Sequence, residues 1–336
     1  MKYALIGCGR VSYKHIIAAK NNNLEIAGLC DVDIKKAIEL KEKYNLKNTN
    51  IYQSFDEMLT IEKPELVAIA VPNYLHFSYA YLALEHNCHI IVEKPLSMTV
   101  RECDILINKS RDKQLYLSVC HQNRFNDAVI FAKEKIMSKE IGDILQISAN
   151  LRWNRDERYY SLSDWRGKRK TDGGILMNQG IHLLDMICWF VESEIDCIYS
   201  FVSNLNHSYI EIDDNVFAFV KFKNNVQAQI EVTTNVYAEN LEETLTIIGT
   251  LGTIKLSGKS MNKIAYYNSQ DNCKDVSLNE KCLDEINDIY GDGHIKLYED
   301  FINSIDNNRE LMISGADGKK AVDFANKIYQ SNLSDY

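Results

Sequence analysis

The sequence predicts two domains: an α/β domain with a parallel sheet, then an α+β domain with a large, mainly antiparallel open sheet. The prediction rests on the length of 336 residues, on alternating apolar runs and amphipathic stretches in the first third, and on a later run of long strands. Since single cores stop growing below roughly 300 residues, such a chain is expected to divide. We expect domains of residues 1–121 and 122–336.

The first domain is expected to contain buried strands separated by helices. Short apolar runs predict strands over residues 3–8, 24–30, 66–71, 89–92 and 115–120. Amphipathic stretches between them, for example Asp33–Tyr44 and His76–His86, have the spacing of helices. This alternation predicts right-handed βαβ crossovers and a parallel sheet covered by helices on both faces.

The second domain is expected to combine a few helices with a sheet. Helices are predicted over 127–138, 179–190, 294–305 and 315–330, and strands over 144–151, 215–223, 226–233, 243–248 and 253–256. Turn sequences such as Lys223-Asn224-Asn225 and Gly249-Thr250-Leu251-Gly252 separate consecutive strands. Short turns of this kind favour antiparallel pairing.

Composition and charge exclude several classes of function. Hydrophobic residues make up 46% and charged residues 25% of the chain, as in ordinary globular proteins. The net charge is −9 and no lysine or arginine cluster forms a basic stripe, so nucleic acid is not an expected partner. No window reaches the roughly 18 apolar residues of a membrane span, and the N-terminus has no signal-peptide pattern. We therefore expect no membrane partner and a cytoplasmic location.

The cysteine pattern argues against disulfides and metal. The nine cysteines are scattered and form no CxxC pair; they are Cys8, Cys30, Cys88, Cys103, Cys120, Cys188, Cys197, Cys273 and Cys282. Neither a disulfide framework nor a zinc knuckle is expected from this spacing, and no metal site is predicted. Several lie in apolar runs, where a reduced cysteine behaves as a small hydrophobic residue.

A glycine-rich turn near the N-terminus predicts a dinucleotide site. Gly7-Cys8-Gly9-Arg10-Val11-Ser12 follows the first apolar run and opens a helical stretch. It matches the pattern GxGxx(G/A) of Rossmann domains, except that Ser12 takes the third small position. Glycine allows the backbone to approach a pyrophosphate, which the helix N-terminus then binds. A glycine turn without any ligand is the alternative explanation of this motif alone.

An acidic residue after the second strand strengthens this prediction. Asp31 lies 22 residues after Gly9, where a carboxylate can accept hydrogen bonds from ribose hydroxyls. The same carboxylate would repel the 2′-phosphate of NADP. NAD is therefore the predicted cofactor, bound by Gly7, Gly9, Arg10, Val11 and Asp31.

Three further segments resemble the Gfo/Idh/MocA family, which includes glucose-fructose oxidoreductase and myo-inositol dehydrogenase. They are Val71–His76, Glu93-Lys94-Pro95 and Asp172–Asp185. The resemblance covers essentially the whole chain and implies a nicotinamide facing a pocket between the Rossmann domain and the open sheet. It also implies a homodimer or homotetramer, because family members commonly associate through that sheet. The residues that it places at the cofactor are Pro72, Asn73, His76, Glu93, Lys94, Gln122, Arg124 and Trp165.

A narrower resemblance concerns the branch that oxidises UDP-N-acetylglucosaminuronic acid at C3 during surface-polysaccharide synthesis. It rests on the segments Arg152–Arg155, Tyr159-Tyr160, Trp165–Gly167 and Met177–His182. Arginine suits bidentate capture of a carboxylate or phosphate, which such a substrate carries. Arg152, Tyr160 and Arg166 are the expected substrate contacts of this segment. A solvated loop is the alternative explanation of the charge run.

Two residues are candidates for the proton transfer that accompanies hydride transfer. Oxidation of an alcohol needs a base for the hydroxyl proton and a group that stabilises charge on oxygen. Lys94 of the EKP motif and His182 fit these roles. Asn178, His182 and Asp185 are spaced i, i+4 and i+7, which places them on one face if the helix already includes Asn178. One histidine, one amide and one carboxylate make a poor zinc set.

The residue at position 178 leaves the proton acceptor open. Many family members carry aspartate there, whereas Asn178 cannot raise the basicity of His182 as a carboxylate would. Both His182 and Lys94 therefore remain candidates. Our hypothesis is that His182 is the base and Lys94 stabilises the alkoxide, while Asn178 binds a substrate hydroxyl and Asp185 orients the imidazole.

The sequence thus predicts an NAD-dependent oxidoreductase that acts on a ring hydroxyl of a sugar or nucleotide sugar. C3 of a UDP-linked N-acetylated uronic acid is the leading substrate. One alternative is a dehydrogenase of a free cyclitol or sugar. Another is a dinucleotide-sensing protein that performs no chemistry; the presence of both Lys94 and His182 argues against it.

Overall fold

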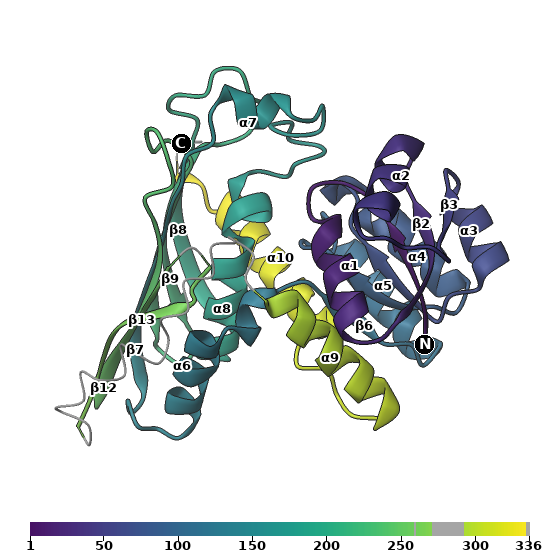
Figure 1. The fold of residues 1–336 in the computed structure, drawn as a ribbon. Coiled ribbons are helices and arrows are strands. Elements are labelled where there is room, and N and C mark those ends of the chain that lie inside the picture. The colour runs from purple at the N-terminus through teal and green to yellow at the C-terminus, as the bar shows by residue number, and fades with distance from the viewer. Residues whose placement is uncertain (259, 271–291, 334–336) are drawn as a thin grey trace. The chain divides into compact units, whose positions relative to one another are not determined.

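The computed structural model describes residues 1–258, 260–270 and 292–333, which belong to two compact units (Figure 1). Unit 1 comprises Met1–His121 and His294–Val322, and unit 2 comprises Gln122–Gly293 and Asp323–Tyr336. The first division falls between His121 and Gln122. Residues 294–322, which the sequence pattern assigned to the second domain, belong to unit 1, so the chain leaves this unit and later returns to it.

Unit 1 contains a six-stranded parallel sheet in the order β3-β2-β1-β4-β5-β6. Its strands are β1 (Lys2–Ile6), β2 (Glu25–Cys30), β3 (Asn50–Tyr52), β4 (Leu66–Ile69), β5 (His89–Val92) and β6 (Leu117–Val119). Every residue of β4 is buried, as expected for a strand covered on both faces. The predicted α/β Rossmann class is confirmed; β3, at three residues, was too short for the apolar pattern to indicate it.

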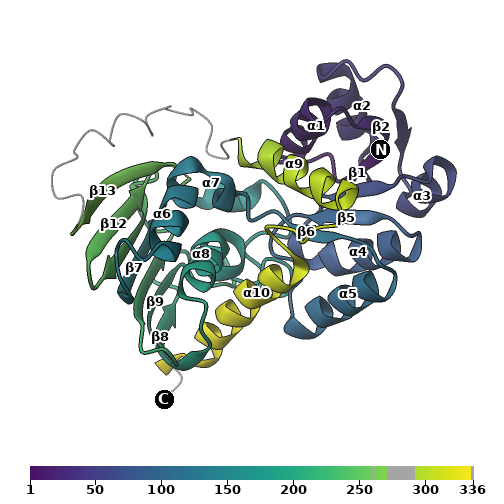
Figure 2. The same ribbon diagram turned by 90° about the horizontal axis from the view of Figure 1, so that it is seen from below.

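The first five helices of unit 1 are α1 (Ser12–Asn21), α2 (Ile34–Lys43), α3 (Phe55–Glu62), α4 (His76–Glu85) and α5 (Val100–Asp112). Side-chain caps begin three of them, α2, α3 and α5. Asp33 caps α2 by accepting a hydrogen bond from the backbone of Lys35. Thr99 and Glu102 form a reciprocal capping box at the start of α5. Figure 2 shows these helices on both faces of the sheet.

The returning segment of unit 1 consists of α9 (Gly293–Asp306) and the first part of α10 (Gly315–Gln330). The Tyr298 hydroxyl lies 3.1 Å from that of Tyr3 on β1, and Ser118 on β6 donates to the carbonyl of Ile313 at 2.8 Å. A Cβ at Gly318 would lie 2.6 Å from Val119 Cγ2, so α10 approaches β6 closely. These contacts join residues between 195 and 295 positions apart, which local sequence patterns cannot reveal.

Unit 2 contains a seven-stranded sheet in the order β13-β12-β11-β7-β10-β9-β8. Its strands are β7 (Ile144–Arg152), β8 (Ile195–Ser203), β9 (Asn215–Phe222), β10 (Gln227–Thr233), β11 (Glu242–Gly249), β12 (Gly252–Ser257) and β13 (Lys263–Ser269). All neighbouring pairs are antiparallel except β7 and β10, which are parallel. The predicted mainly antiparallel sheet is confirmed.

Helices cover one face of this sheet. They are α6 (Asp127–Met137), α8 (Ile181–Val191) and the last part of α10, while the short helix α7 (Glu157–Ser161) belongs to the loop after β7 (Figure 1). Val216, Ala218 and Val220 of β9 are buried, whereas Phe217 and Phe219 between them are exposed. This alternation defines an inner face packed on helices and an open face.

The helix predicted over 179–190 begins differently from the prediction. A π-helical turn, Leu176–Gly180, precedes α8. Asn178 therefore lies in the π turn, and α-helical spacing from Asn178 to His182 and Asp185 does not apply. Single π turns of this kind occur frequently at functional sites.

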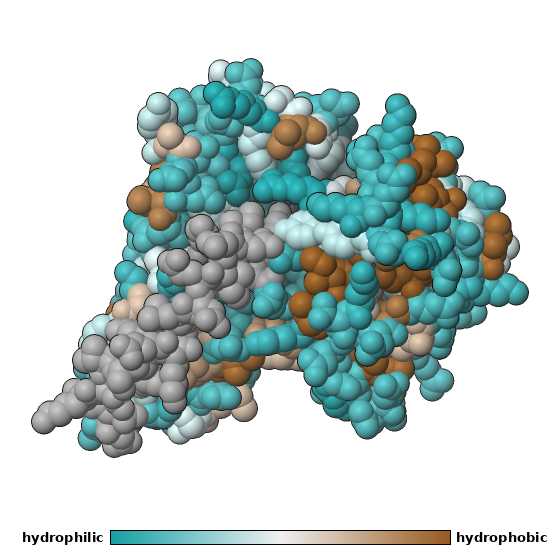
Figure 3. Space-filling view, in the orientation of Figure 1, coloured by the Kyte–Doolittle hydropathy of each residue, from teal (hydrophilic) through white to brown (hydrophobic). Residues whose placement is uncertain are grey.

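Surface and thiol properties agree with the composition. Figure 3 shows a face that is mainly hydrophilic, with hydrophobic residues in separate patches. No helix among the described residues is long and apolar enough to span a bilayer. The cysteines within the described ranges are free thiols, five of them buried, whereas Cys273 and Cys282 lie outside those ranges.

Candidate functional site

The glycine-rich turn of unit 1 joins β1 to α1 and approaches β4 very closely. Gly7 has a φ of +90°, and a Cβ there would lie 2.3 Å from the carbonyl oxygen of Ala70. At Gly9, by contrast, a Cβ would meet nothing within 4 Å. Packing thus requires glycine at position 7, while Gly9 and exposed Arg10 leave the backbone open to a ligand.

The third small position of the motif has a local role. The Ser12 hydroxyl donates to the carbonyl of Gly9 at 2.6 Å, and Ser12 itself begins α1 immediately after Val11. The hydroxyl therefore closes the turn from within, and the first backbone N–H groups of α1 follow directly. This geometry is suited to a pyrophosphate.

Asp31 lies beside this turn. Its Oδ2 accepts a hydrogen bond from Cys8 N at 2.8 Å, and its Oδ1 accepts one from Asp33 N at 2.8 Å. Each carboxylate oxygen retains a lone pair for a further donor. The structure therefore brings Asp31 to the glycine turn and leaves it able to accept from ribose hydroxyls, so these residues fit NAD.

The segment after β4 is fixed by a buried histidine. His76 is fully buried, with Nδ1 2.5 Å from the carbonyl of Pro95 and Nε2 2.9 Å from the carbonyl of Val71. Burial lowers the pKa of His76, whereas the hydrogen bonds to the two carbonyls act in the opposite direction. His76 thus holds together the loops after β4 and β5, while Pro72 is partly exposed and Asn73 buried.

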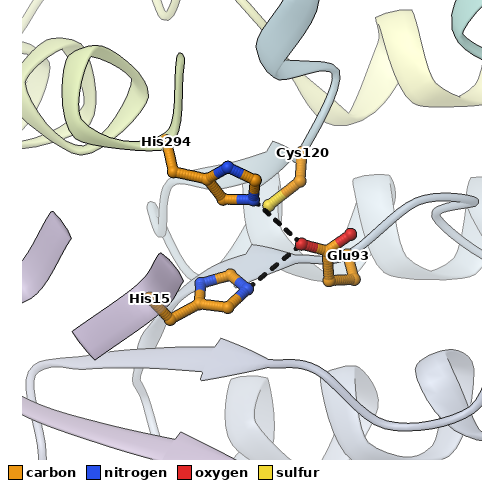
Figure 4. A group of neighbouring side chains, drawn as sticks. All are labelled: His15, Glu93, Cys120 and His294. Carbon is orange, nitrogen blue, oxygen red and sulfur yellow. Dashed lines mark hydrogen bonds and ion pairs between the residues drawn. The ribbon is translucent and has the colours of Figure 1, made fainter. Parts of the chain in front are cut away.

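Glu93 and Lys94 follow β5 and have different surroundings. Glu93 Oε1 accepts from His15 Nε2 at 3.2 Å and from His294 Nε2 at 3.1 Å (Figure 4). Burial alone would raise the pKa of Glu93, but the hydrogen bonds from both histidines outweigh it and hold that pKa well below its ordinary value. The carboxylate, which the family resemblance placed at the cofactor, is therefore an ionised anchor directly before the partly exposed Lys94.

In unit 2, Asn178 is held by a carboxylate that the sequence did not single out. Asn178 Nδ2 donates to Asp172 Oδ1 at 2.9 Å, and Asp172 Oδ2 accepts from Gly167 N at 2.8 Å. Asp172 is fully buried and Asn178 is 8% exposed. The only signal for Asp172 was its place at the start of the motif Asp172-Gly173-Gly174. Its carboxylate orients the Asn178 amide.

His182 and Asp185 lie in α8, and Asp185 has a strong partner. Arg124 Nε donates to Asp185 Oδ2 at 2.8 Å, and Arg124 Nη2 donates to Oδ1 at 2.6 Å. Both residues are 1% exposed, and the guanidinium stacks over Trp189. His182 is partly exposed. The Asp185 carboxylate is therefore already bound to Arg124. If Asp185 orients the His182 imidazole, it does so while it keeps this pair with Arg124.

Two residues expected at the cofactor are buried in unit 2. Gln122 and Arg124 lie in a short 3₁₀ turn, Gln122–Phe125, and are 4% and 1% exposed. Since the Arg124 guanidinium is enclosed by Asp185 and Trp189, it has almost no surface to offer a cofactor. We therefore revise its assignment from a cofactor ligand to a buried partner of Asp185.

A cluster of arginines and aromatic rings lies in the loop after β7. The Tyr159 hydroxyl accepts from Arg166 Nη1 at 2.7 Å and from Gln179 Nε2 at 3.2 Å. The guanidinium of Arg166 also lies over the rings of Tyr159 and Trp165, at 4.7 and 4.6 Å from their centroids. Tyr159 thus links partly exposed Arg166 and Trp165 to the π turn that contains Asn178.

Tyr160 and Arg152 are placed less favourably for a ligand. Tyr160 is 5% exposed and packs against His207 and Tyr209. Arg152 donates to Glu231 Oε1 at 2.7 Å and also pairs with Glu242. Two carboxylates therefore surround this guanidinium.

Arg152 also lies on the other face of the sheet. Leu151 pairs with Val232, and Val232 lies beside Gly180 of the π turn. Because successive side chains of a strand point to opposite faces, Arg152 points away from that turn. The structure therefore brings together Asn178, Gln179, Tyr159 and Arg166, but not Arg152.

Family models match both parts of the chain. Residues 1–121 match the NAD-binding Rossmann fold of an oxidoreductase family, and residues 129–255 match the GFO/IDH/MocA C-terminal domain. The chain belongs to the GFO/IDH/MocA oxidoreductase family. Unit 1 thus contains the family's NAD-binding domain, and the predicted cofactor, NAD, is confirmed.

Individual relatives differ in what their names say they act on. The WlbA dehydrogenase from Bordetella pertussis, solved with NADH and UDP-GlcNAcA, has a TM-score of 0.90 and 26% identity, covering 100% of this chain and 96% of its own. D-glucoside 3-dehydrogenase of Escherichia coli (strain K12) is 29% identical over 190 residues, 55% of this chain and 52% of that protein. Glucose-6-phosphate 3-dehydrogenase of Bacillus subtilis (strain 168) is 28% identical over 196 residues, which cover 57% of this chain and 54% of that protein. The chain spans about half the length of these two curated relatives.

Asp31 should determine the preference for NAD over NADP. We expect Asp31→Asn to weaken NAD⁺ binding about tenfold and to reduce the discrimination against NADP⁺ by a similar factor, because the charge that repels a 2′-phosphate is gone. Calorimetric titration with both dinucleotides measures this. Asp33→Asn is the matched control, since Asn also caps α2. Unchanged discrimination in Asp31→Asn would assign cofactor choice to other residues.

Proposed function

We propose that this protein is an NAD-dependent dehydrogenase that oxidises a sugar ring hydroxyl, with C3 of a UDP-linked N-acetylated uronic acid as its leading substrate. The observation that carries the proposal is the contact of Arg166 with Tyr159, which Gln179 joins to the π turn bearing Asn178. In this arrangement the Arg166 guanidinium could bind an anionic group of the substrate. The Asn178 amide, in the neighbouring π turn, could bind a hydroxyl of the sugar. Surface-polysaccharide synthesis is the pathway we propose for this activity.

The comparisons support a sugar substrate. Two substrate classes remain to be distinguished: nucleotide sugars and free sugars or cyclitols. The WlbA protein, similar over the full length of this chain, was solved with a nucleotide sugar that carries a carboxylate. The two curated relatives are named for oxidation at position 3 of a glucoside or of glucose 6-phosphate. These two names favour the third ring position for a sugar that is not linked to a nucleotide. A dehydrogenase of a free sugar or cyclitol is therefore the second candidate.

Unit 1 supplies the groups that would hold the cofactor. The backbone from Gly7 to Val11 and the N-terminus of α1 would bind the pyrophosphate, and Asp31 would accept from ribose hydroxyls. When bound, NAD supplies the hydride acceptor for the C–H hydrogen of the oxidised carbon. Lys94 would place its ammonium by the substrate oxygen and stabilise the charge that develops there.

Unit 2 supplies the groups that would handle the substrate. Nδ1 of His182 is buried, so Nε2 is the nitrogen that would take the hydroxyl proton as the C–O bond becomes a carbonyl. Asn178, held by Asp172, would bind a hydroxyl of the sugar ring. Arg166 would pair with the substrate carboxylate or phosphate. Arg152 contributes less, because Glu231 and Glu242 already neutralise it.

We also propose that a second copy of the chain covers the open face of the unit 2 sheet. Tyr199 on β8 lies directly opposite Phe219 on β9, and their exposed fractions are 59% and 58%. Phe201 and Phe217 form the next exposed pair of the same register. Four large aromatic side chains on adjacent strands make an exposed apolar patch of the kind found at interfaces.

A substrate panel tests the proposed activity. We expect NAD⁺ reduction with UDP-GlcNAcA, at a kcat/KM about 10- to 100-fold above that with neutral UDP-GlcNAc, because a charge-assisted pair adds roughly 1.5–3 kcal/mol. Arg166→Gln should remove most of this difference, whereas Arg152→Gln should change it less than about threefold. Equal turnover of both substrates, or turnover of free cyclitols alone, would favour the second candidate. Dinucleotide binding without turnover of any substrate would favour the sensor.

His182→Asn tests the base. We expect kcat to fall by about 10² to 10⁴ while the NAD⁺ dissociation constant stays unchanged, because general-base catalysis is lost and the cofactor site is intact. The rise of the wild-type rate with pH, as the imidazole loses its proton, should disappear. His86→Asn, at a partly exposed histidine of unit 1, is the control. If His182→Asn retains this pH profile and Lys94→Met loses it, the base is Lys94.

Charge on the open sheet face tests the predicted oligomer. We expect Phe219→Glu to shift the protein toward the monomer in sedimentation velocity, because each interface would bury the new carboxylate. Lys43→Glu, at an exposed residue of α2 in unit 1, is the control for added negative charge. An unchanged oligomer in Phe219→Glu, or a monomeric wild type, contradicts this proposal.

A further inference from the structure

Four side chains of unit 1 converge at a place that neither the glycine turn nor the sugar chemistry uses. They are His15 on α1, Glu93 after β5, Cys120 after β6 and His294 on α9 (Figure 4). One ligand atom from each lies within 4.8 Å of all the others. Exposure of these residues ranges from 0% to 8%. The cluster is therefore preformed and shielded from water.

We propose that His15, Glu93, Cys120 and His294 bind one zinc-class divalent metal ion as a structural site. Two imidazoles, a thiolate and a carboxylate are ligands that zinc accepts in tetrahedral sites. The thiolate and imidazoles disfavour magnesium and calcium, which prefer oxygen ligands. Because the protein supplies all four ligands, no position remains open for a substrate, as in structural rather than catalytic sites.

The distances suit such an ion. Tetrahedral bonds of about 2.0–2.3 Å place neighbouring ligand atoms roughly 3.3–3.6 Å apart. The two histidine Nε2 atoms lie 3.2 and 3.1 Å from Glu93 Oε1. These two distances are close to that spacing. Every other pair of ligand atoms lies within 4.8 Å, so the widest pairs would have to close by up to about 1 Å around a metal ion. Figure 4 shows all four side chains pointing toward one another.

The surroundings of His15 provide the outer support that metal-binding histidines usually have. His15 Nδ1 lies 2.7 Å from the Tyr298 hydroxyl, which in turn lies 3.1 Å from the Tyr3 hydroxyl. A hydrogen bond at Nδ1 fixes the orientation of the ring and leaves Nε2 for the metal. Tyr3 and Tyr298 are fully buried, so this support is rigid.

Charge balance also favours a metal ion. A divalent cation bound by one carboxylate, one thiolate and two neutral imidazoles forms a neutral group. Neutrality matters because an uncompensated charge is costly at a site without water. Without the ion, Glu93 keeps its negative charge and depends on hydrogen bonds from the two histidines.

The site has a structural consequence for the chain path. Cys120 immediately precedes His121, where the chain leaves unit 1, and His294 is the residue at which it returns. A metal ion bound to both Cys120 and His294 would cross-link the points where the chain leaves unit 1 and re-enters it, and so would close a loop of about 170 residues. It would also fix Glu93, the residue before Lys94. Because the four residues are buried, we expect the metal to be taken up during folding.

Metal analysis of the intact protein tests this proposal. We expect about one zinc per chain after desalting, and less than about one tenth in Cys120→Ser and His294→Gln. Protein from cobalt-supplemented cultures should show thiolate-to-cobalt charge transfer and the visible bands of tetrahedral Co²⁺. Cys103→Ser, at a buried thiol of unit 1 outside the cluster, should retain both signals.

Several outcomes would overturn the proposal. Wild-type protein without zinc and without the cobalt spectrum would mean that the four residues form only a hydrogen-bonded network. Retention of full zinc in the double variant Cys120→Ser/His294→Gln would place the metal elsewhere. If either variant does not fold, the wild-type cobalt spectrum still decides. NAD⁺ and substrate turnover are measured separately, so failure of the metal site is distinguishable from failure of the proposed function.

Discussion

In unit 1, the parallel direction of all six strands brings the ends of the strands to one edge of the sheet. Gly7 follows β1, Asp31 follows β2, Lys94 follows β5 and Cys120 follows β6, so residues far apart in the sequence share that edge. The strand order reverses between β1 and β4, and there Gly7 approaches Ala70 too closely for any side chain. Ligands of open α/β sheets bind at this reversal. Backbone packing thus creates the cofactor site.

Buried carboxylates then position the residues that would react. Glu93, bonded to two histidines, precedes Lys94 in the chain, and Asp185, bonded to Arg124, lies one turn after His182. Asp172 holds the amide of Asn178 in the same way. A buried carboxylate is tolerated only with donors around it, so each one fixes its neighbourhood. The three candidates for chemistry or substrate binding thus lie beside buried carboxyl groups that are held by hydrogen bonds.

The two arginines of the loop segment illustrate how surroundings decide the role of one residue type. Arg152 lies between Glu231 and Glu242 on the open face of the sheet. Arg166 instead contacts neutral aromatic rings and keeps its full positive charge near the π turn. A guanidinium already paired with two carboxylates attracts a further anion weakly, whereas one stacked on rings retains that attraction. The proposed preference for an acidic nucleotide sugar therefore depends on Arg166.

The sequence by itself determined what short-range interactions control. Apolar periodicity indicated most strands and helices, and the glycine spacing located the dinucleotide turn. Asp31 was indicated by its place after the second apolar run, 22 residues after Gly9. Tertiary structure alone decided the parallel pairing of β7 with β10, the return of residues 294–322 to unit 1, the Arg124–Asp185 pair and the His15–Glu93–Cys120–His294 cluster. Local sequence patterns reflect the hydrogen bonding of a segment's own backbone and show which of its faces will be buried. Which distant segment packs against that buried face depends on the packing of the whole unit. This choice of partner produces no periodic pattern in the sequence.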